Sequence, residues 1–148
     1  MRWIVLGLAA LVIAACSQAG NLHNQIVWTG GVGYDVRAIT ASGGPPTYEA
    51  TASYTTAHAN ERPQILKNLL YRGVSKVKSD GYDYVRVQGA NNTTLTATTY
   101  RYGTPISSSS YPGVKVRLVG YKAGAPRPPN AMEATAWLAR LKADGAGG

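Results

Sequence analysis

A single amphipathic segment, residues 60–81, sets the main limit on how this chain can fold. Its apolar side chains recur at the spacing of one helix face, and they are Ile65, Leu66, Leu69, Leu70, Val74 and Val77. We expect the helix to begin with Asn60 as its cap and Pro63 in its first turn, and to end at Asp80-Gly81. Because one helix cannot bury such a stripe alone, the rest of the chain must supply a surface that covers it.

That surface is predicted to be a sheet, because the segments around the helix alternate between apolar and polar residues. The expected strands are residues 32–40, 48–56, 82–88, 93–102 and 114–121. The first two should form a hairpin across the Gly-Pro turn at 43–46. The sequence also predicts a turn at 89–92 and a loop at 103–113, which contains the serine run 107–110.

A shorter helix is expected near the C-terminus, after three prolines that break the chain. Asn130 is a candidate cap with Glu133 three residues later, and the buried stripe would be Ala134, Trp137, Leu138 and Leu141. Residues 143–148 should fray. The predicted fold is α+β, with a mainly antiparallel sheet of about five strands, one long helix on one face and a short C-terminal helix.

The N-terminus is typical of a secretory signal. Arg2 precedes an apolar run over residues 4–15, which is too short to cross a bilayer as a helix. We therefore expect a signal peptide at 1–15, a lipidated cysteine with a polar tether at 16–25, and one domain over 26–148. A second domain of ordinary size would not fit in the remaining length.

Residues 13–16 read Ile-Ala-Ala-Cys and resemble the lipobox of bacterial lipoproteins. The resemblance implies cleavage between Ala15 and Cys16 and acylation of the Cys16 sulfur and amino group. Ser17 in the next position implies sorting to the outer membrane, with the domain facing the periplasm. The alternative is a buried apolar cysteine. Cys16 is the single cysteine of the chain, so no disulfide is expected.

Three further motifs resemble a family of small proteobacterial lipoproteins of unknown function. Residues 69–73 read LLYRG, residues 80–85 read DGYDYV, and 130–134 read NAMEA, followed by Leu138 and Leu141. The order and spacing of these motifs cover nearly the whole mature chain. Gly73 departs from the pattern, because alanine is usual there. The resemblance implies the fold and the location, and it implies no chemistry.

The same motifs supply a candidate ligand groove where the helix meets the third predicted strand. Its residues would be Tyr71, Arg72, Tyr82, Asp83 and Tyr84. The alternative is structural: Tyr71 and Arg72 could cover the sheet edge or pair with Asp83, and Tyr82 and Tyr84 could simply alternate along a strand.

Residues suited to catalysis are few, and we predict no enzyme activity, no cofactor and no metal. His23 lies in the tether, and His58 with Glu61 lies near a helix N-terminus. Two interpretations of His58 remain open: a solvated loop histidine, or a ligand for an anion or a metal. The chain contains none of the common hydrolase, metalloprotease or phosphate-loop motifs. The glycine-rich stretch 29–33 lacks the lysine of a phosphate loop and is interpreted as the flexible start of the first strand.

Positive charge is the remaining signal. The chain has a formal net charge of +8, and loss of Arg2 with the signal peptide leaves 14 basic and 7 acidic side chains. A periplasmic location argues against nucleic acid as the partner. The expected partners are the membrane through the lipid anchor and either another envelope protein, peptidoglycan carboxylates or anionic lipid headgroups. The alternative is that the basic side chains are solvated over the surface in general and form no specific anion site.

The sequence favours a non-catalytic, lipid-anchored cell-envelope protein that binds another envelope component. One alternative is an envelope-stress or surface sensor, which would need a mobile element such as 103–113. Another is a cell-wall or lipid hydrolase, which would need a pocket where histidine and carboxylates converge.

Overall fold

The computed structural model describes residues 27–29 and 31–147. The predictions of signal cleavage, lipidation and sorting fall on Ala15, Cys16 and Ser17, which lie outside the described residues. None of the helices in the described part of the chain is long and apolar enough to cross a membrane.

The described strands form one antiparallel sheet of six strands in the order β1-β2-β3-β5-β4-β6. They are β1 (Val27–Thr29), β2 (Val32–Ala38), β3 (Thr47–Tyr54), β4 (Tyr84–Arg101), β5 (Thr104–Tyr121) and β6 (Met132–Glu133). The predicted hairpin of the first two long strands is confirmed as the antiparallel pair β2–β3. The predicted α+β class is confirmed, with two very short strands at the sheet edges.

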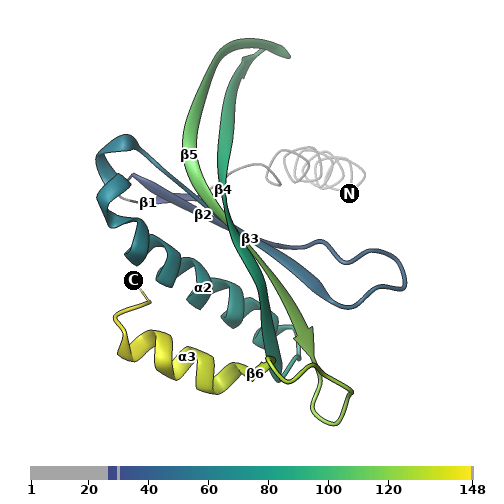
Figure 1. Ribbon diagram of the computed structural model, residues 1–148. Helices are drawn as coiled ribbons and strands as arrows, with labels where there is room; N and C mark the ends of the chain where they lie inside the picture. Colours follow the sequence, from purple (N-terminus) through teal and green to yellow (C-terminus); the bar gives the residue numbers. More distant parts are fainter. Residues whose placement is uncertain (1–26, 30, 148) are drawn as a thin grey trace, which may run out of the picture.

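Both α-helices, α2 (Arg62–Ser79) and α3 (Ala134–Ala143), lie on one side of the sheet (Figure 1). The predicted stripes face the core. Buried members are Ile65, Leu69, Val74 and Val77 on α2 and Ala134 and Leu141 on α3, whereas Leu66, Leu70, Trp137 and Leu138 are partly buried. Asn60 is not the helix cap, which corrects the prediction. A 3₁₀-helix, η1 (Thr56–Glu61), occupies that stretch, and α2 starts directly after it. The helix ends as predicted, with Gly81 at a φ of 95°.

A close approach between α2 and the sheet explains why glycine occurs in the middle of this helix. Gly73 is buried, and a side-chain carbon at this position would overlap Leu118 on β5 and would touch Ala50 on β3. The small residues Ala50 and Ala52 face the same interface and are fully buried. Gly73 therefore lets the helix lie close to the sheet, although glycine is unfavourable in helix interiors.

The longest feature is the β4–β5 hairpin, which extends well beyond the body of the molecule and curls over at its end (Figure 1). It overturns two predictions, the turn at 89–92 and the loop at 103–113. A register shift between Val87 and Gly89 lets β4 continue where a turn was expected. The serine run is strand because its residues pair with Thr96–Thr99 of β4. The chain reverses at Tyr102-Gly103, which both have positive φ.

The C-terminal region differs from its prediction in two respects. Asn130 does not cap α3, because Met132 and Glu133 pair with β4 as strand β6 and Glu133 precedes the helix. The tail was expected to fray, but Ala146 is buried and three hydrogen bonds tie the tail to α2, one of them from Lys67 Nζ to the Asp144 carbonyl at 3.2 Å. Gln64 donates to the Gly145 carbonyl at 2.8 Å, and the Gly147 N–H donates to Asn68.

Candidate functional site

The face of the sheet opposite the helices carries charged side chains at its centre. Directly paired residues of antiparallel strands project from the same face, and Glu49 of β3 pairs with Arg37 of β2 and with Arg117 of β5. Lys115 lies two residues before Arg117 and therefore shares this face. We call the side chains of Arg37, Glu49, Lys115 and Arg117 the Glu49 cluster.

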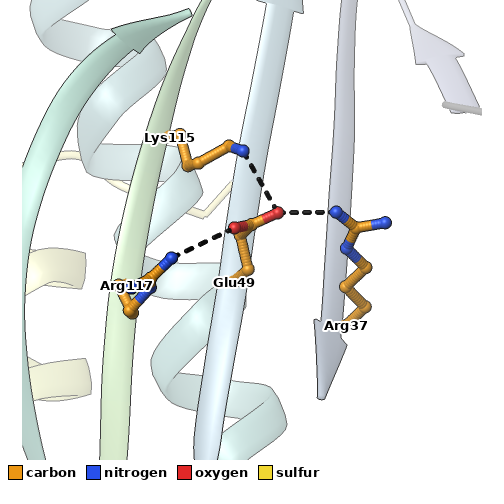
Figure 2. A network of polar contacts seen from close by, with 4 residues as sticks. All are labelled: Arg37, Glu49, Lys115 and Arg117. Atoms are coloured by element: carbon orange, nitrogen blue, oxygen red, sulfur yellow. Dashed lines mark hydrogen bonds and ion pairs between the residues drawn. The ribbon is translucent and has the colours of Figure 1, made fainter. Parts of the chain in front are cut away.

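One carboxylate in this cluster meets three cations (Figure 2). Glu49 Oε1 accepts a hydrogen bond from Arg37 Nη2 at 2.7 Å and lies 3.3 Å from Lys115 Nζ. Its other oxygen, Oε2, lies 3.8 Å from Arg117 Nη2. The Glu49 side chain is only 6% exposed, whereas those of Arg37 and Arg117 are more than half exposed. The cluster therefore has a buried anion at its base and an excess of positive charge at the surface.

The pKa of the Glu49 carboxyl reflects two opposing effects. Burial raises this pKa, but the hydrogen bonds from Arg37 and Lys115 outweigh burial and hold it below its usual value. The pKa of Arg37 is raised, chiefly by its hydrogen bond to Glu49. Glu49 is therefore ionised at neutral pH and fully engaged, which makes it a poor general acid and a good anchor for the cations around it.

A pocket of about 510 Å³ lies beside the cluster on the same face. Its lining residues come from β4, β5 and the loop before β6, and they are Arg86, Val87, Gln88, Gly89, Asn91, Lys115, Arg117 and Asn130. Three of these side chains are cationic, three carry an amide, and none is acidic or a histidine. The adjoining part of the loop packs on the sheet, with the Arg127 guanidinium 3.6 Å from the centre of the Tyr84 ring.

Tyr71 and Arg72 of the predicted groove lie on the other side of the molecule, on α2. They line a second pocket of about 420 Å³ with Asn68, Ser75 and Gly147. The Arg72 guanidinium also lies 4.7 Å from the centre of the Tyr34 ring of β2. The C-terminal tail, which was expected to fray, forms part of this pocket.

Tyr82, Asp83 and Tyr84 lie together near the start of β4, apart from that pocket. Tyr82 packs edge-on against Tyr48, with ring centres 6.3 Å apart. Asp83 accepts a hydrogen bond from the Ala123 N–H at 2.9 Å. The structure therefore divides the five predicted groove residues into two groups, and each group makes packing or hydrogen-bond contacts.

The histidine considered as a ligand has a local structural contact. His58 Nδ1 lies 2.8 Å from the Thr55 hydroxyl, and its ring packs so closely on Gly31 that a side chain there would collide with it. The glycine-rich stretch thus includes a turn between β1 and β2 over which His58 lies. Within the described residues no group of three or more His, Cys, Asp or Glu side chains could hold a metal ion.

The Glu49 cluster and its pocket were not predicted from the sequence. Part of the pattern is visible in the sequence. Polar positions of alternating strands are occupied by Arg37, Glu49, Lys115 and Arg117. Bringing them together required the order β2-β3-β5 and its register, and neither can be read from periodicity.

Comparisons of this chain with protein-family models, with curated proteins and with solved structures found no match.

Proposed function

We propose that this protein is a non-catalytic lipoprotein of the outer membrane that faces the periplasm and binds another envelope protein through its β4–β5 hairpin. The hairpin carries this proposal. Its outer part presents large side chains to solvent: Tyr100 is 64% exposed, Tyr102 is 95% exposed and Ile106 is 59% exposed. Exposed tyrosine and aliphatic side chains gathered at one site are typical of protein-binding surfaces.

The free edge of β4 supports a protein partner over a lipid or cell-wall partner. Among the described residues β4 pairs with β6 only at Tyr84 and Val85, so the rest of this edge has no strand beside it. Residues 88–100 contain no charged side chain and no proline, which are two of the devices that protect an exposed edge. A strand from another protein could add to this edge through backbone hydrogen bonds.

Two observations favour this proposal over its alternatives. The loop 103–113, which a sensor would have used as its mobile element, is part of the paired strand β5. The two pockets described above are lined by basic, amide, hydroxyl and apolar groups, and neither brings histidine together with carboxylates. Binding chemistry therefore fits the described surfaces better than hydrolysis does.

Position-specific cross-linking in cells tests the binding site. A photoreactive residue at Thr98 on the hairpin should capture a defined partner, and the same residue at the exposed Lys78 on α2 should not. Adding the substitution Thr96→Lys to the protein that carries the photoreactive residue at Thr98 should reduce capture, because an added charge disfavours strand addition at an edge. Equal capture from Thr98 and Lys78, or capture of lipid or peptidoglycan alone, would contradict a hairpin-bound protein partner.

The anchor is tested separately. Cys16→Ala should leave an uncleaved and unlipidated precursor, visible as a size shift and a loss of acyl labelling. Ser17→Asp should leave processing intact and move the protein to the inner membrane. Normal processing of Cys16→Ala would contradict lipidation, and an unchanged location of Ser17→Asp would contradict the sorting signal.

A further inference from the structure

The pocket beside the Glu49 cluster has an unbalanced charge. Lys115 and Arg117 line the pocket and also contact Glu49, which is shared with Arg37. One carboxylate thus serves three cations, so the cluster keeps two positive charges in excess. Arg86 adds another positive charge at the pocket wall.

Arg86 has an unused hydrogen-bond donor. Its Nε is buried and has no hydrogen-bond partner among the residues that the structure describes. A buried N–H without an acceptor destabilises the protein, and more so when the group is charged. An anion against this guanidinium would offset that cost by supplying negative charge close to the unpaired donor.

Glu49 also makes the pocket ready for a ligand before any ligand arrives. Its two oxygens hold the head groups of Lys115 and Arg117 on one side of the pocket, on two alternate positions of β5. Fixed side chains lose less rotamer freedom when a ligand binds, and this strengthens binding. Because Glu49 carries one negative charge and contacts three cations, it neutralises only part of their positive charge.

We propose that this pocket binds an oxyanion, a phosphate or a carboxylate, carried on a small molecule or terminal group about the size of a sugar. The guanidinium groups of Arg86 and Arg117 have the fork geometry that matches either oxyanion. The amides of Gln88, Asn91 and Asn130 also line the pocket and suit neutral hydroxyl or amide groups. The volume of about 510 Å³ falls within the usual range for small-molecule sites.

This site shares only Gln88, Gly89 and Asn91 with residues 88–100 of the free edge of β4 and does not reach the hairpin tip, and it is argued from its own charges, so the inference does not rest on the function proposed above. The hairpin would bind a protein through its exposed edge and tip, and the pocket would bind an anion at the base of β4 and β5. A phosphate could come from a lipid headgroup and a carboxylate from the cell wall, and the test below separates these sources by chemistry.

Calorimetric titration of the full-length protein in non-ionic detergent tests the proposal, with glucose 6-phosphate, glucuronate and glucose as probes. We expect one or both charged sugars to bind, glucose not to bind, and added salt to weaken binding. Preference for glucose 6-phosphate would indicate a phosphate source, and preference for glucuronate would indicate a carboxylate source. No binding by either charged sugar, or equal binding by glucose, would overturn the proposal.

Matched variants locate the binding. Arg86→Gln and Lys115→Gln should each lower the affinity about tenfold or more, since each removes one charged hydrogen-bond donor. Arg101→Gln removes the same charge at the hairpin tip and should leave the affinity unchanged. Arg86→Lys should retain part of the binding, and circular dichroism should confirm that each variant is folded. Equal losses in Arg86→Gln and Arg101→Gln would overturn the site.

Discussion

The two halves of strand β5 pair with the same partner strand and yet have opposite surroundings. From Gly113 to Gly120 the strand lies between β3 and β4, and most of its residues are buried. From Thr104 to Ser110 every residue is exposed, although pairing with β4 continues along this stretch. Backbone pairing alone therefore does not bury a strand, because burial needs a third strand and the helix that covers it.

The largest expected effect comes from the buried half. Leu118 of β5 is fully buried under α2, so Leu118→Ala should lower the free energy of unfolding by about 2–5 kcal/mol. Urea denaturation monitored by circular dichroism measures this change. A loss below about 1 kcal/mol would mean that α2 does not pack over this half of β5 as described.

The close contact between α2 and β5 predicts the next effect. Gly73→Val places two methyl groups where Leu118 lies, so we expect a loss of about 1–3 kcal/mol from overpacking. Exposed Lys78→Val on the same helix introduces the same side chain without that contact and should have a much smaller effect. Similar losses in the two variants would indicate that β-branching in the helix, and not the contact with Leu118, sets the cost.

The Glu49 cluster lies across the same half of β5, on its other face, and should contribute less. Glu49→Gln should destabilise the protein by about 1–2 kcal/mol at pH 7, below the cost for a fully buried pair because its partners are half exposed. The folded-state pKa of Glu49 is lowered, so its contribution is present above the unfolded-state pKa. It is lost as the pH falls through the folded-state pKa.

The pH dependence distinguishes a charge effect from a packing effect in this variant. The stability difference between the wild-type protein and Glu49→Gln should shrink as the pH falls from neutral through the lowered folded-state pKa of Glu49, where the wild-type carboxyl also becomes protonated. Urea denaturation at a series of pH values measures it. A difference that stays constant over this range would show that the ionised carboxylate does not stabilise the fold.

Sequence reasoning succeeded in the buried half of β5 and failed in the exposed half, and burial explains both. Val114, Val116 and Leu118 alternate with polar residues because one face is covered, and that alternation is the signal used to predict strands. Ser107–Ser110 form a strand by pairing with β4, which leaves no apolar pattern to detect. The Glu49 cluster was missed for a different reason. Strand order and register decide which polar residues meet, and neither can be read from the alternation of residues along one strand.

The smallest expected effect belongs to the exposed half and bears directly on its role. Ile106→Ala should change the free energy of unfolding by no more than about 0.5 kcal/mol, since the side chain is 59% exposed and contributes little to the core. Urea denaturation beside Leu118→Ala measures the contrast along one strand. A loss above about 1 kcal/mol would mean that the hairpin end packs against something in the isolated protein. If the loss is negligible, Ile106, which is exposed on the same hairpin end as Tyr100 and Tyr102, contributes nothing to folding, as the proposed binding role of the hairpin predicts.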